Sequence, residues 1–320
     1  MGRNHARAYG EIPGFELVAI ADIDRTRAAE ISARHGCRAY GDHLEMLDTE
    51  RPDAVSVVVP TRDHFAVAVA ALERGCHVLV EKPIAGTIEE AEQLLACAES
   101  ADRVLMVGHI ERYNPALQEM RRRLEAGQLG RIYQAKARRL GPFPSRIRDV
   151  GVVVDLATHD LDVMRFLVGS EVERVYAETK REIHTLHEDA LSGLLRFADG
   201  VVGVLDINWL TPTKIREITL TGERGMFQAD YLTQDLRFFE NSETAETPWG
   251  EMAVLRGVNE GSMTRYAIPK REPLVCELEG FLAGCGGDLA SIVPGSDGLV
   301  ALRLALALIS SAETHQVVEP

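Results

Sequence analysis

Short apolar runs alternate with amphipathic segments along the first third of the chain. The apolar runs cover residues 16–21, 54–59, 77–80 and 104–108. Each is bounded by Gly, Pro or Asp, which is typical of strands that are buried on both faces. Between them, residues 63–74 place apolar side chains at helical spacing, and Thr87 and Glu90 form a capping box that opens a helix to about Ser100. This alternation predicts a Rossmann-like, doubly wound parallel sheet with helices on both faces.

The pattern changes after about residue 112. A helix is expected to about Ala126, and the strands that follow are longer and alternate between apolar and polar positions. They cover residues 132–140, 190–197, 201–209, 218–221 and 226–231. Asp199 and Gly200 form a strong hairpin signal, and a last helix over residues 298–313 is apolar on nearly all sides and should be buried. We therefore predict two domains, residues 1–112 with the parallel sheet and residues 113–320 as an α/β domain with an open, mainly antiparallel sheet.

Composition and charge narrow the functional classes. The 320 residues are 46% hydrophobic and 26% charged, which is the balance of a globular protein. Lys and Arg total 35 against 49 Asp and Glu, and the net charge of −14 disfavours nucleic acid and anionic membranes as partners. The 5 cysteines form no CxxC pair, so neither a zinc site nor a disulfide framework is expected. The apolar stretches are too short to span a bilayer and no signal-peptide core is present, so we expect a cytoplasmic protein.

Asp22 ends the first apolar run and indicates a dinucleotide site. In a Rossmann unit, an acid at this position accepts hydrogen bonds from ribose hydroxyls and lies about 20 residues after a glycine-rich turn. Counting back from Asp22 reaches Gly2, so Gly2 and Arg3 are expected at the cofactor, and the first strand and two glycines of the motif are missing. Either the start of the chain is assigned too late or trimmed, or a natural truncation weakens or abolishes cofactor binding. The acid favours NAD over NADP, while Arg25 keeps NADP open.

Lys82 lies in the sequence Glu81-Lys82-Pro83, directly after an apolar run. The carboxyl end of a parallel strand faces the crevice in which ligands bind. A desolvated lysine there can hydrogen-bond a substrate hydroxyl and ease the loss of its proton. The alternative is an ordinary exposed loop lysine.

Asp155 and His159 are four residues apart, so on a helix they share one face. Histidine is the natural general base near neutral pH, and a carboxylate can orient its ring or the substrate. The pair can also form an intrahelical salt bridge or supply two arms of a metal site. Because no suitable third ligand lies nearby in the sequence, we expect no metal.

A third cluster runs from Gly108 to Pro115, with the sequence GHIERYNP. It begins at the end of a predicted strand and opens a helix, with Asn114 as the cap and Pro115 in the first turn. Such a turn faces the crevice. A ligand-binding role and a structural role as cap and domain hinge are both open.

Together these motifs resemble the Gfo/Idh/MocA family of oxidoreductases, and the resemblance covers nearly the whole chain. It implies a Rossmann domain, a second open-sheet domain that commonly mediates oligomers, and oxidation or reduction of sugar and cyclitol carbons with a nicotinamide cofactor. It also implies that Lys82 contacts the reacting hydroxyl, that Asp155 orients the substrate and that His159 is the general acid/base. Further cofactor contacts are expected from Pro60, Thr61, His64, Glu81 and Lys82.

Residues 108–115 and 208–216 resemble more narrowly the branch of this family that oxidises C3 of UDP-N-acetylglucosamine. A diphosphate requires cations, and Lys214 and Arg216 alternate along one predicted strand. The expected substrate contacts are His109, Arg112, Tyr113, Asn114, Arg139, Arg146, Lys214 and Arg216, although each charge can equally be an exposed or interface charge. The rivals are a dehydrogenase of another sugar, an inositol or a UDP-linked uronic acid, and a non-catalytic sugar-nucleotide-binding subunit. A homodimer or homotetramer is expected.

Overall fold

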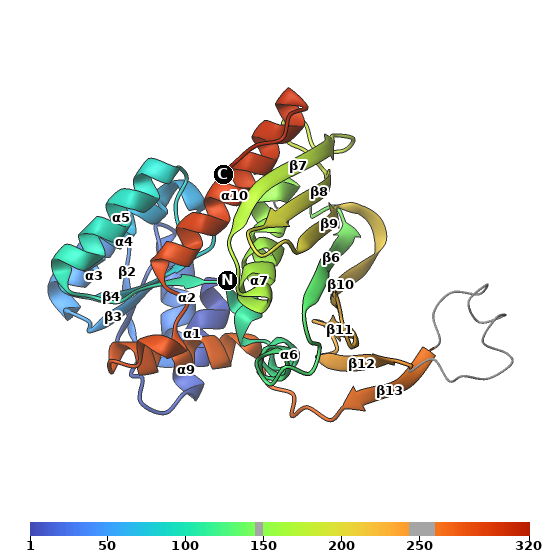
Figure 1. Ribbon diagram of the computed structural model, residues 1–320. Helices are drawn as coiled ribbons and strands as arrows, with labels where there is room; N and C mark the ends of the chain where they lie inside the picture. The colour runs from blue at the N-terminus through green and yellow to red at the C-terminus, as the bar shows by residue number, and fades with distance from the viewer. Residues whose placement is uncertain (145–149, 243–259) are drawn as a thin grey trace, which may run out of the picture. The chain divides into compact units, whose positions relative to one another are not determined.

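A computed structural model describes residues 1–144, 150–242 and 260–320 of the chain (Figure 1). These residues form two units. The first unit contains Met1–Tyr113 and Arg271–Arg303, and the second contains Asn114–Lys270 and Leu304–Pro320. This division differs from the predicted domains, because residues 271–303 pack with the first unit instead of the second.

The strands of the first unit are parallel and form two sheets. β1 (Ala19–Ala21) pairs with β2 (Arg38–Tyr40), and β3 (Ala54–Val57), β4 (His77–Glu81) and β5 (Leu105–Gly108) form the second sheet in that order. Within the described residues no strand precedes the first helix, and β1 and β3 are not paired with each other. The predicted Rossmann-like parallel arrangement is confirmed. β2 was not predicted, because its three residues are too few and too exposed to form an apolar run.

Helices connect these strands. They are α1 (Gly2–Glu11), α2 (Arg25–His35), α3 (His43–Glu50), α4 (Thr61–Leu72), α5 (Ile88–Ala101) and the short η1 (Ile110–Tyr113), with α9 (Pro273–Cys285) and η3 (Leu289–Ser291) added much later in the chain. The side chain of Thr87 accepts a hydrogen bond from the N–H of Glu90 at 3.1 Å, which confirms the predicted start of α5. The Glu90 carboxylate reaches the N–H of Gly86 rather than that of Thr87, so the reciprocal half of the capping box is shifted by one residue.

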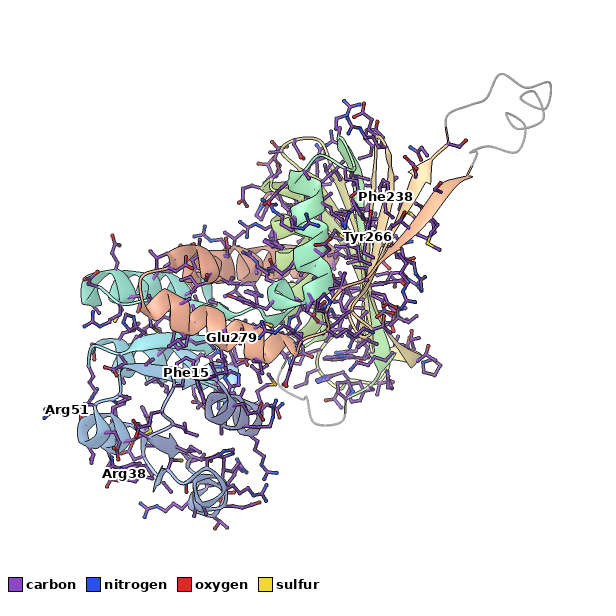
Figure 2. All side chains as sticks on the ribbon, turned by 90° about the horizontal axis from the view of Figure 1, so that it is seen from below. Phe15, Arg38, Arg51, Phe238, Tyr266 and Glu279 are labelled. Atoms are coloured by element: carbon purple, nitrogen blue, oxygen red, sulfur yellow. The ribbon has the colours of Figure 1, made fainter. Side chains whose placement is uncertain are left out.

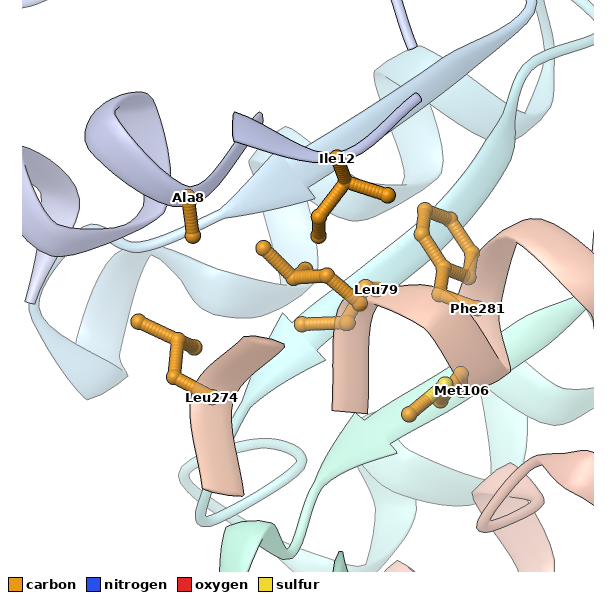
Figure 3. Close-up of a cluster of buried hydrophobic side chains, with 7 residues drawn as sticks. Ala8, Ile12, Leu79, Met106, Leu274 and Phe281 are labelled. Atoms are coloured by element: carbon orange, nitrogen blue, oxygen red, sulfur yellow. The ribbon is translucent and has the colours of Figure 1, made fainter. Parts of the chain in front are cut away.

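A cluster of apolar side chains holds α1 and α9 against the sheet of β3, β4 and β5 (Figure 3). It contains Ala8 and Ile12 from α1, Leu79 from β4, Met106 from β5, and Leu274, Leu278 and Phe281 from α9. Each of the seven is at most 4% exposed. Because burial of apolar surface is the main stabilising term in folding, this cluster explains why α9 belongs to the first unit.

The described strands of the second unit form one sheet, in the order β13-β12-β11-β10-β6-β9-β8-β7. They are β6 (Ile132–Pro142), β7 (Val172–Lys180), β8 (Ala190–Phe197), β9 (Val202–Asn208), β10 (Leu210–Gly222), β11 (Gly225–Asp230), β12 (Asp235–Asn241) and β13 (Glu260–Tyr266). β6 and β9 are parallel and the other neighbours are antiparallel, which confirms the mainly antiparallel sheet. The ends of β6, β7 and β9 and the starts of β8 and β10 meet at one border of the sheet, which we call the loop edge.

Helices cover one face of this sheet. α6 (Pro115–Glu125) contacts β11 and β12, and α7 (Thr158–Val168) contacts β6 (Figure 1). Along β9, buried and half-buried residues alternate, as expected for a sheet with one covered face. Phe238 of β12 and Tyr266 of β13 both approach Phe227 of β11, with ring centroids 4.7 and 6.5 Å from it. Figure 2 labels Phe238 and Tyr266 on these two strands.

The last helix, α10 (Gly295–Thr314), begins in the first unit and ends in the second. By length and composition alone it could cross a membrane, but 61% of its most apolar window is buried. A buried core helix passes the same test. The predicted burial of an apolar helix over residues 298–313 is therefore confirmed.

Candidate active site

The carboxyl ends of β3, β4 and β5 bring three predicted segments to the same border of the sheet. Thr61 begins α4 directly after Pro60, Lys82 and Pro83 follow β4, and His109 follows β5. Parallel strands end on the same side, which is the side at which open α/β sheets bind ligands. Lys82 is half-buried, whereas the alternative interpretation expects an exposed lysine in a loop.

Glu81 belongs to a buried hydrogen-bonded network that links β4 to α1. Nε2 of His5 lies 2.9 Å from Oε1 of Glu81, and Nδ1 of His5 lies 3.3 Å from Oγ of Ser56. The hydroxyl of Tyr9 lies 2.5 Å from the same Ser56 oxygen. Burial alone would raise the pKa of Glu81, but the hydrogen bond from His5 and the nearby positive charges, including Lys82, together hold the pKa below its ordinary value. Sequence reasoning missed His5, Tyr9 and Ser56, because no local pattern links them to Glu81.

His64 connects the turn after β3 to the turn after β4. Its Nδ1 lies 2.8 Å from the carbonyl oxygen of Pro83, and its Nε2 lies 3.0 Å from that of Val59. The residue is 1% exposed, and burial lowers the pKa of the imidazole below its ordinary value. The neutral ring has one N–H to donate, so it joins the two turns through one of these carbonyl oxygens. The cofactor contact of His64 stays a prediction.

Gly2 and Arg3 form the first turn of α1. A Cβ added at Gly2 would meet no atom within 4 Å, so the space beside this glycine is open. The guanidinium of Arg3 is exposed and lies 4.0 Å from the carboxylate of Glu30. The N–H groups of a helix N-terminus point away from the helix and favour anions such as a pyrophosphate.

Asp22 follows β1 and presents a carboxylate at the carboxyl end of that strand. Its Oδ1 accepts a hydrogen bond from the N–H of Asp24 at 2.9 Å, and its Oδ2 lies 3.2 Å from Nη1 of Arg27. Arg25 begins α2 and its side chain lies against Gly41. A carboxylate at a strand end and a helix N-terminus in the same unit are the groups that an NAD molecule needs for its ribose hydroxyls and pyrophosphate, so the residues present fit this cofactor.

The residues that follow β5 are held by contacts within the first unit. His109 is 2% exposed. The guanidinium of Arg112 lies 2.8 Å from the carboxylate of Asp297, and the hydroxyl of Tyr113 donates to the carbonyl oxygen of Ser291 at 2.9 Å. These contacts fix the segment, and its role in substrate binding remains a prediction.

Asn114 opens the second unit as the cap of α6. Its Oδ1 accepts the N–H of Ala116 and its Nδ2 donates to the carbonyl oxygen of Tyr231, both at 3.1 Å. Its side chain is buried and both ends of its amide are engaged. These contacts show Asn114 as the helix cap, and its predicted contact with substrate stays a prediction.

Asp155 and His159 lie on one continuous helical segment of the second unit. A π-helical turn (Val153–Ala157, labelled η2) contains Asp155, and α7 follows it at once with His159 near its start. Both residues are half-buried. π-helical turns are rare and frequently occur at functional sites. Lys82 belongs to the first unit, so these three predicted catalytic residues are distributed over both units.

Arg139 has a structural partner in the core of the second unit. Its Nε and Nη2 lie 2.6 and 3.2 Å from the two carboxylate oxygens of Asp160, and the guanidinium lies 5.3 Å from the ring centre of Tyr231. Arg139 is 3% exposed and Asp160 is fully buried. The buried carboxylate of Asp160 neutralises the charge of Arg139, which accounts for the burial of this arginine, and its phosphate contact stays a prediction.

The other predicted cations of the second unit differ in their surroundings. Lys214 is exposed, in a stretch of β10 where the pairing with β6 is irregular. Arg216 is half-buried, and its guanidinium donates to the carbonyl oxygens of Leu140 at 2.7 Å and Ile215 at 2.9 Å. Arg146 lies outside the described residues.

The five cysteines are free thiols. Among the residues that the structure describes, no group of three or more His, Cys, Asp or Glu side chains is arranged to hold a metal ion.

Comparison with known proteins gives matches along nearly the whole chain. Residues 1–109 match the oxidoreductase family with an NAD-binding Rossmann fold, and residues 117–228 match the Gfo/Idh/MocA C-terminal domain. The UDP-N-acetylglucosamine 3-dehydrogenase of Acidithiobacillus ferrooxidans is 32% identical, over 96% of this chain and 92% of that protein. The myo-inositol 2-dehydrogenase of Thermotoga maritima is 26% identical, over 100% of this chain and 95% of that protein.

A solved structure also resembles this chain over nearly its whole length. The fold resembles that of UDP-N-acetylglucosamine 3-dehydrogenase GnnA from Acidithiobacillus ferrooxidans with a TM-score of 0.84 and 31% identity, covering 98% of this chain and 94% of that one. The two domain matches follow one another along the chain in the same order as the Rossmann-like strands and the mainly antiparallel sheet. The chain therefore belongs to the Gfo/Idh/MocA family of oxidoreductases and is a dehydrogenase with an NAD-binding Rossmann domain.

Proposed function

We propose that this dehydrogenase oxidises a sugar hydroxyl with NAD, and that its substrate is UDP-N-acetylglucosamine, oxidised at C3 to the 3-keto sugar nucleotide. The observation that carries the proposal is the likeness to a UDP-N-acetylglucosamine 3-dehydrogenase over 96% of the chain. The sequence also has a lysine, an aspartate and a histidine, Lys82, Asp155 and His159, in the pattern expected of a proton-transfer site.

Each of these three side chains has a distinct role in the proposed reaction. His159 takes the proton of the sugar hydroxyl as the general base. Lys82 donates a hydrogen bond to the same oxygen and stabilises the negative charge that develops there. Asp155, on the preceding helical turn, orients the His159 ring or the sugar. NAD, when bound, supplies the acceptor for the hydride that leaves the sugar carbon, and the carbon–oxygen bond becomes a carbonyl.

The residues that would hold NAD lie in the first unit. Gly2 and Arg3 at the start of α1 suit the pyrophosphate, and Asp22 suits the adenosine ribose hydroxyls. Thr61 and Lys82, after β3 and β4, would line the remainder of the cofactor. The Asp22 carboxylate repels a 2′-phosphate, so we expect NAD to be preferred to NADP. We expect the attraction of Arg25 and Arg27 for that phosphate to be too small to reverse the preference.

Titration calorimetry tests the cofactor part of the proposal. NADH should bind at least about tenfold more tightly than NADPH, because a carboxylate beside a phosphate is repulsive. Asp22→Ala should weaken the binding of NADH and so bring the affinities for NADH and NADPH closer together. Adding UDP-N-acetylglucosamine should tighten NADH binding further. Equal binding of NADH and NADPH by the unaltered chain would contradict the assignment of Asp22.

A specific observation also favours a second substrate class. The myo-inositol 2-dehydrogenase of Thermotoga maritima matches 100% of this chain. An inositol has ring hydroxyls suited to the same proton transfer but carries no diphosphate, so cations such as Lys214 would have no partner on it.

A substrate panel separates the two classes. NADH formation is measured with UDP-N-acetylglucosamine, free N-acetylglucosamine, myo-inositol and a UDP-linked uronic acid, and the product is identified by NMR. We expect turnover with UDP-N-acetylglucosamine, a 3-keto product and much weaker turnover with the free sugar. Turnover of myo-inositol alone would replace the proposed substrate, and no turnover of any of the four would remove the proposed activity.

A further inference from the structure

We propose that Glu188, in the loop between β7 and β8, is a positioning residue that fixes the helical segment carrying Asp155 and His159. The inference rests on the proposed function for its catalytic consequence. Its structural half concerns only contacts within the second unit and can be tested without any substrate.

The helical segment needs a partner at its start. It begins at Val152 and continues through the π-helical turn into α7. The first N–H groups of any helix have no acceptor inside the helix. The residue before Val152 is Gly151, which has no side chain and cannot supply the capping oxygen that Ser, Thr, Asp or Asn would give.

Glu188 supplies two acceptors from a distant part of the chain. Its carbonyl oxygen accepts the N–H of Val152 at 3.0 Å, and its side-chain Oε1 accepts the N–H of Val153, also at 3.0 Å. A negative charge at the N-terminal end of a helix is also favoured by the helix dipole. Glu188 therefore caps the segment in place of the missing side chain of Gly151.

Gly151 and Glu188 are matched in shape. A Cβ added at Gly151 would overlap the Glu188 carboxylate. Only glycine at this position lets the carboxylate approach the first helical N–H groups. An alanine at Gly151 should therefore displace the cap without altering Glu188 itself.

The loop that carries Glu188 is itself fixed to the loop edge. The carboxylate of the next residue, Asp189, accepts the N–H groups of Glu182 at 2.6 Å, Ile183 at 2.7 Å and His184 at 3.0 Å. The backbone of Asp189 bonds to Lys180 at 2.7 Å and to Trp209 at 2.8 Å. Burial alone would raise the pKa of Asp189, but the three N–H donors outweigh burial and lower the pKa. These hydrogen bonds tie the backbone next to Glu188 to the end of β7 and to Trp209 after β9.

The cap is about one turn away from Asp155 and about two turns away from His159. The N–H of Asp155 donates to the carbonyl oxygen of Gly151 at 3.0 Å. A π-helical turn has a different hydrogen-bond register from an α-helical turn. If the first turn frays, the π-helical turn that follows it loses this bond to Gly151, Asp155 shifts relative to His159, and the proposed proton-transfer geometry is lost.

Three variants test the proposal by activity. Glu188→Ala removes the side-chain acceptor, whereas Glu188→Gln retains an oxygen at Oε1. Glu182→Ala is the matched control, because that exposed carboxylate lies on the same loop and contacts only the Lys180 ammonium at 2.9 Å in the described structure. We expect Glu188→Ala to lower kcat about tenfold, the scale of a lost helix cap, with the Kd for NADH unchanged. Glu188→Gln and Glu182→Ala should stay within about twofold of the unaltered chain.

Hydrogen exchange tests the structural half independently. The amides of residues 152–158 should exchange about tenfold faster in Glu188→Ala, because each lost cap raises the population of the opened turn. They should be unchanged in Glu188→Gln, and Gly151→Ala should reproduce the Glu188→Ala result. Unchanged exchange in Glu188→Ala would overturn the proposal that Glu188 caps the segment.

The two halves fail in distinguishable ways. Faster exchange in Glu188→Ala with an unaltered kcat would overturn the claim that the cap positions Asp155 and His159. The claim that Glu188 caps the segment would still stand. An equal fall in kcat and in NADH affinity would mean general damage and would also overturn it. If the unaltered chain turns over none of the sugars, the proposed function fails, and the exchange result still decides whether Glu188 caps the segment.

Discussion

The imidazole of His5 and the carboxylate of Glu81 lie 2.9 Å apart in the interior of the first unit, joining the first helix to the residue that precedes Lys82. The two side chains are 3% and 12% exposed. Burial raises the pKa of Glu81, but His5 and the nearby positive charges together hold the pKa below its ordinary value, so the carboxylate stays ionised next to the proposed catalytic lysine. This pair therefore links the stability of α1 to the electrostatics of the site.

The first prediction is that His5→Ala destabilises the protein at neutral pH. Removing the partner leaves a buried carboxylate without its donor, and we expect a loss of about 1.5–3 kcal/mol in the free energy of unfolding. Glu81 has a lowered pKa in the folded state, so its contribution is present above its unfolded value of about 4.3 and disappears as the pH falls through the folded value. The difference between the variant and the unaltered chain should therefore shrink below about pH 4.

Urea denaturation at pH 3 to 7 measures this difference. His43→Ala is the control, because His43 lies at the surface and approaches only Asp42, at 3.6 Å, in the described structure. It should change the free energy of unfolding by less than about 0.5 kcal/mol at every pH. Equal stability of His5→Ala and the unaltered chain at pH 7 would refute the proposed role of the pair.

The second prediction concerns Glu277, a fully buried residue of α9. Neither of its carboxyl oxygens has a hydrogen-bond partner within the described structure. Burial raises the pKa of Glu277 well above its ordinary value, and the nearby charges of Glu81 and Glu111 raise it further. The folded protein therefore keeps a proton here that the unfolded chain releases above about pH 4.3. Folding stability must fall as the pH rises from that value towards the folded pKa.

Glu277→Gln removes the titrating proton and should stabilise the protein at pH 8 by more than about 1 kcal/mol, with little effect at pH 4. Glu279→Gln on the same helix is the control, since the Glu279 side chain is 39% exposed and pairs with Arg271 at 2.7 Å. Its effect should be small and nearly independent of pH. Chemical denaturation across this range is the measurement, and a stability difference for Glu277→Gln that does not grow with pH would count against the buried neutral acid.

Local sequence signals predicted the parts of the fold that depend on neighbouring residues. Thr87 caps α5, Asn114 caps α6, and Gly200 adopts the positive φ of 93° that the hairpin between β8 and β9 requires. α2 has an equally good cap in Asp24 but was not predicted. Its buried residues are only Ala28, Ile31 and Ser32, which is too little apolar surface for a clear helical period.

Contacts between distant segments could not be predicted in this way. α9 follows the second domain in the sequence, yet Leu274 and Phe281 pack against Leu79 of the first unit. The apolar pattern of α9 shows that one face is buried but does not identify its partner. For the same reason, the sequence does not show that Asp160 pairs with Arg139 or that the carbonyl oxygen of Tyr231 accepts a hydrogen bond from Asn114.

The third prediction concerns the proposed proton-transfer residues. If His159 is the general base, His159→Ala should lower kcat by about 10²–10⁴, and because its ring is only half-buried the free energy of unfolding should change by no more than about 1 kcal/mol. Lys82→Ala should lower kcat on the same scale. Lys180→Ala is the control for the loss of a lysine charge, since its side chain is 69% exposed. Near-normal turnover in both His159→Ala and Lys82→Ala would show that the site is assigned wrongly.

The last prediction separates the two cations proposed for the diphosphate. Lys214 is exposed, whereas the guanidinium of Arg216 already donates to the carbonyl oxygens of Leu140 and Ile215. Lys214→Ala should raise the KM for UDP-N-acetylglucosamine about tenfold, the value of a charge-assisted hydrogen bond, without changing the thermal midpoint. Arg216→Ala should raise KM too, but it should also destabilise the fold by about 1 kcal/mol through the lost backbone contacts.

Inhibition by UDP identifies which part of the substrate these side chains contact. If Lys214 binds the diphosphate, the inhibition constant for UDP and the KM for the sugar nucleotide must rise by the same factor in Lys214→Ala, while turnover of a free sugar is unaffected. Lys136→Ala, an exposed lysine on β6 of the same sheet, controls for the general loss of positive charge and should change neither constant. If both Lys214→Ala and Arg216→Ala leave the KM unchanged, these cations do not bind the diphosphate. An increase in KM without a change in UDP inhibition would instead place Lys214 at the sugar.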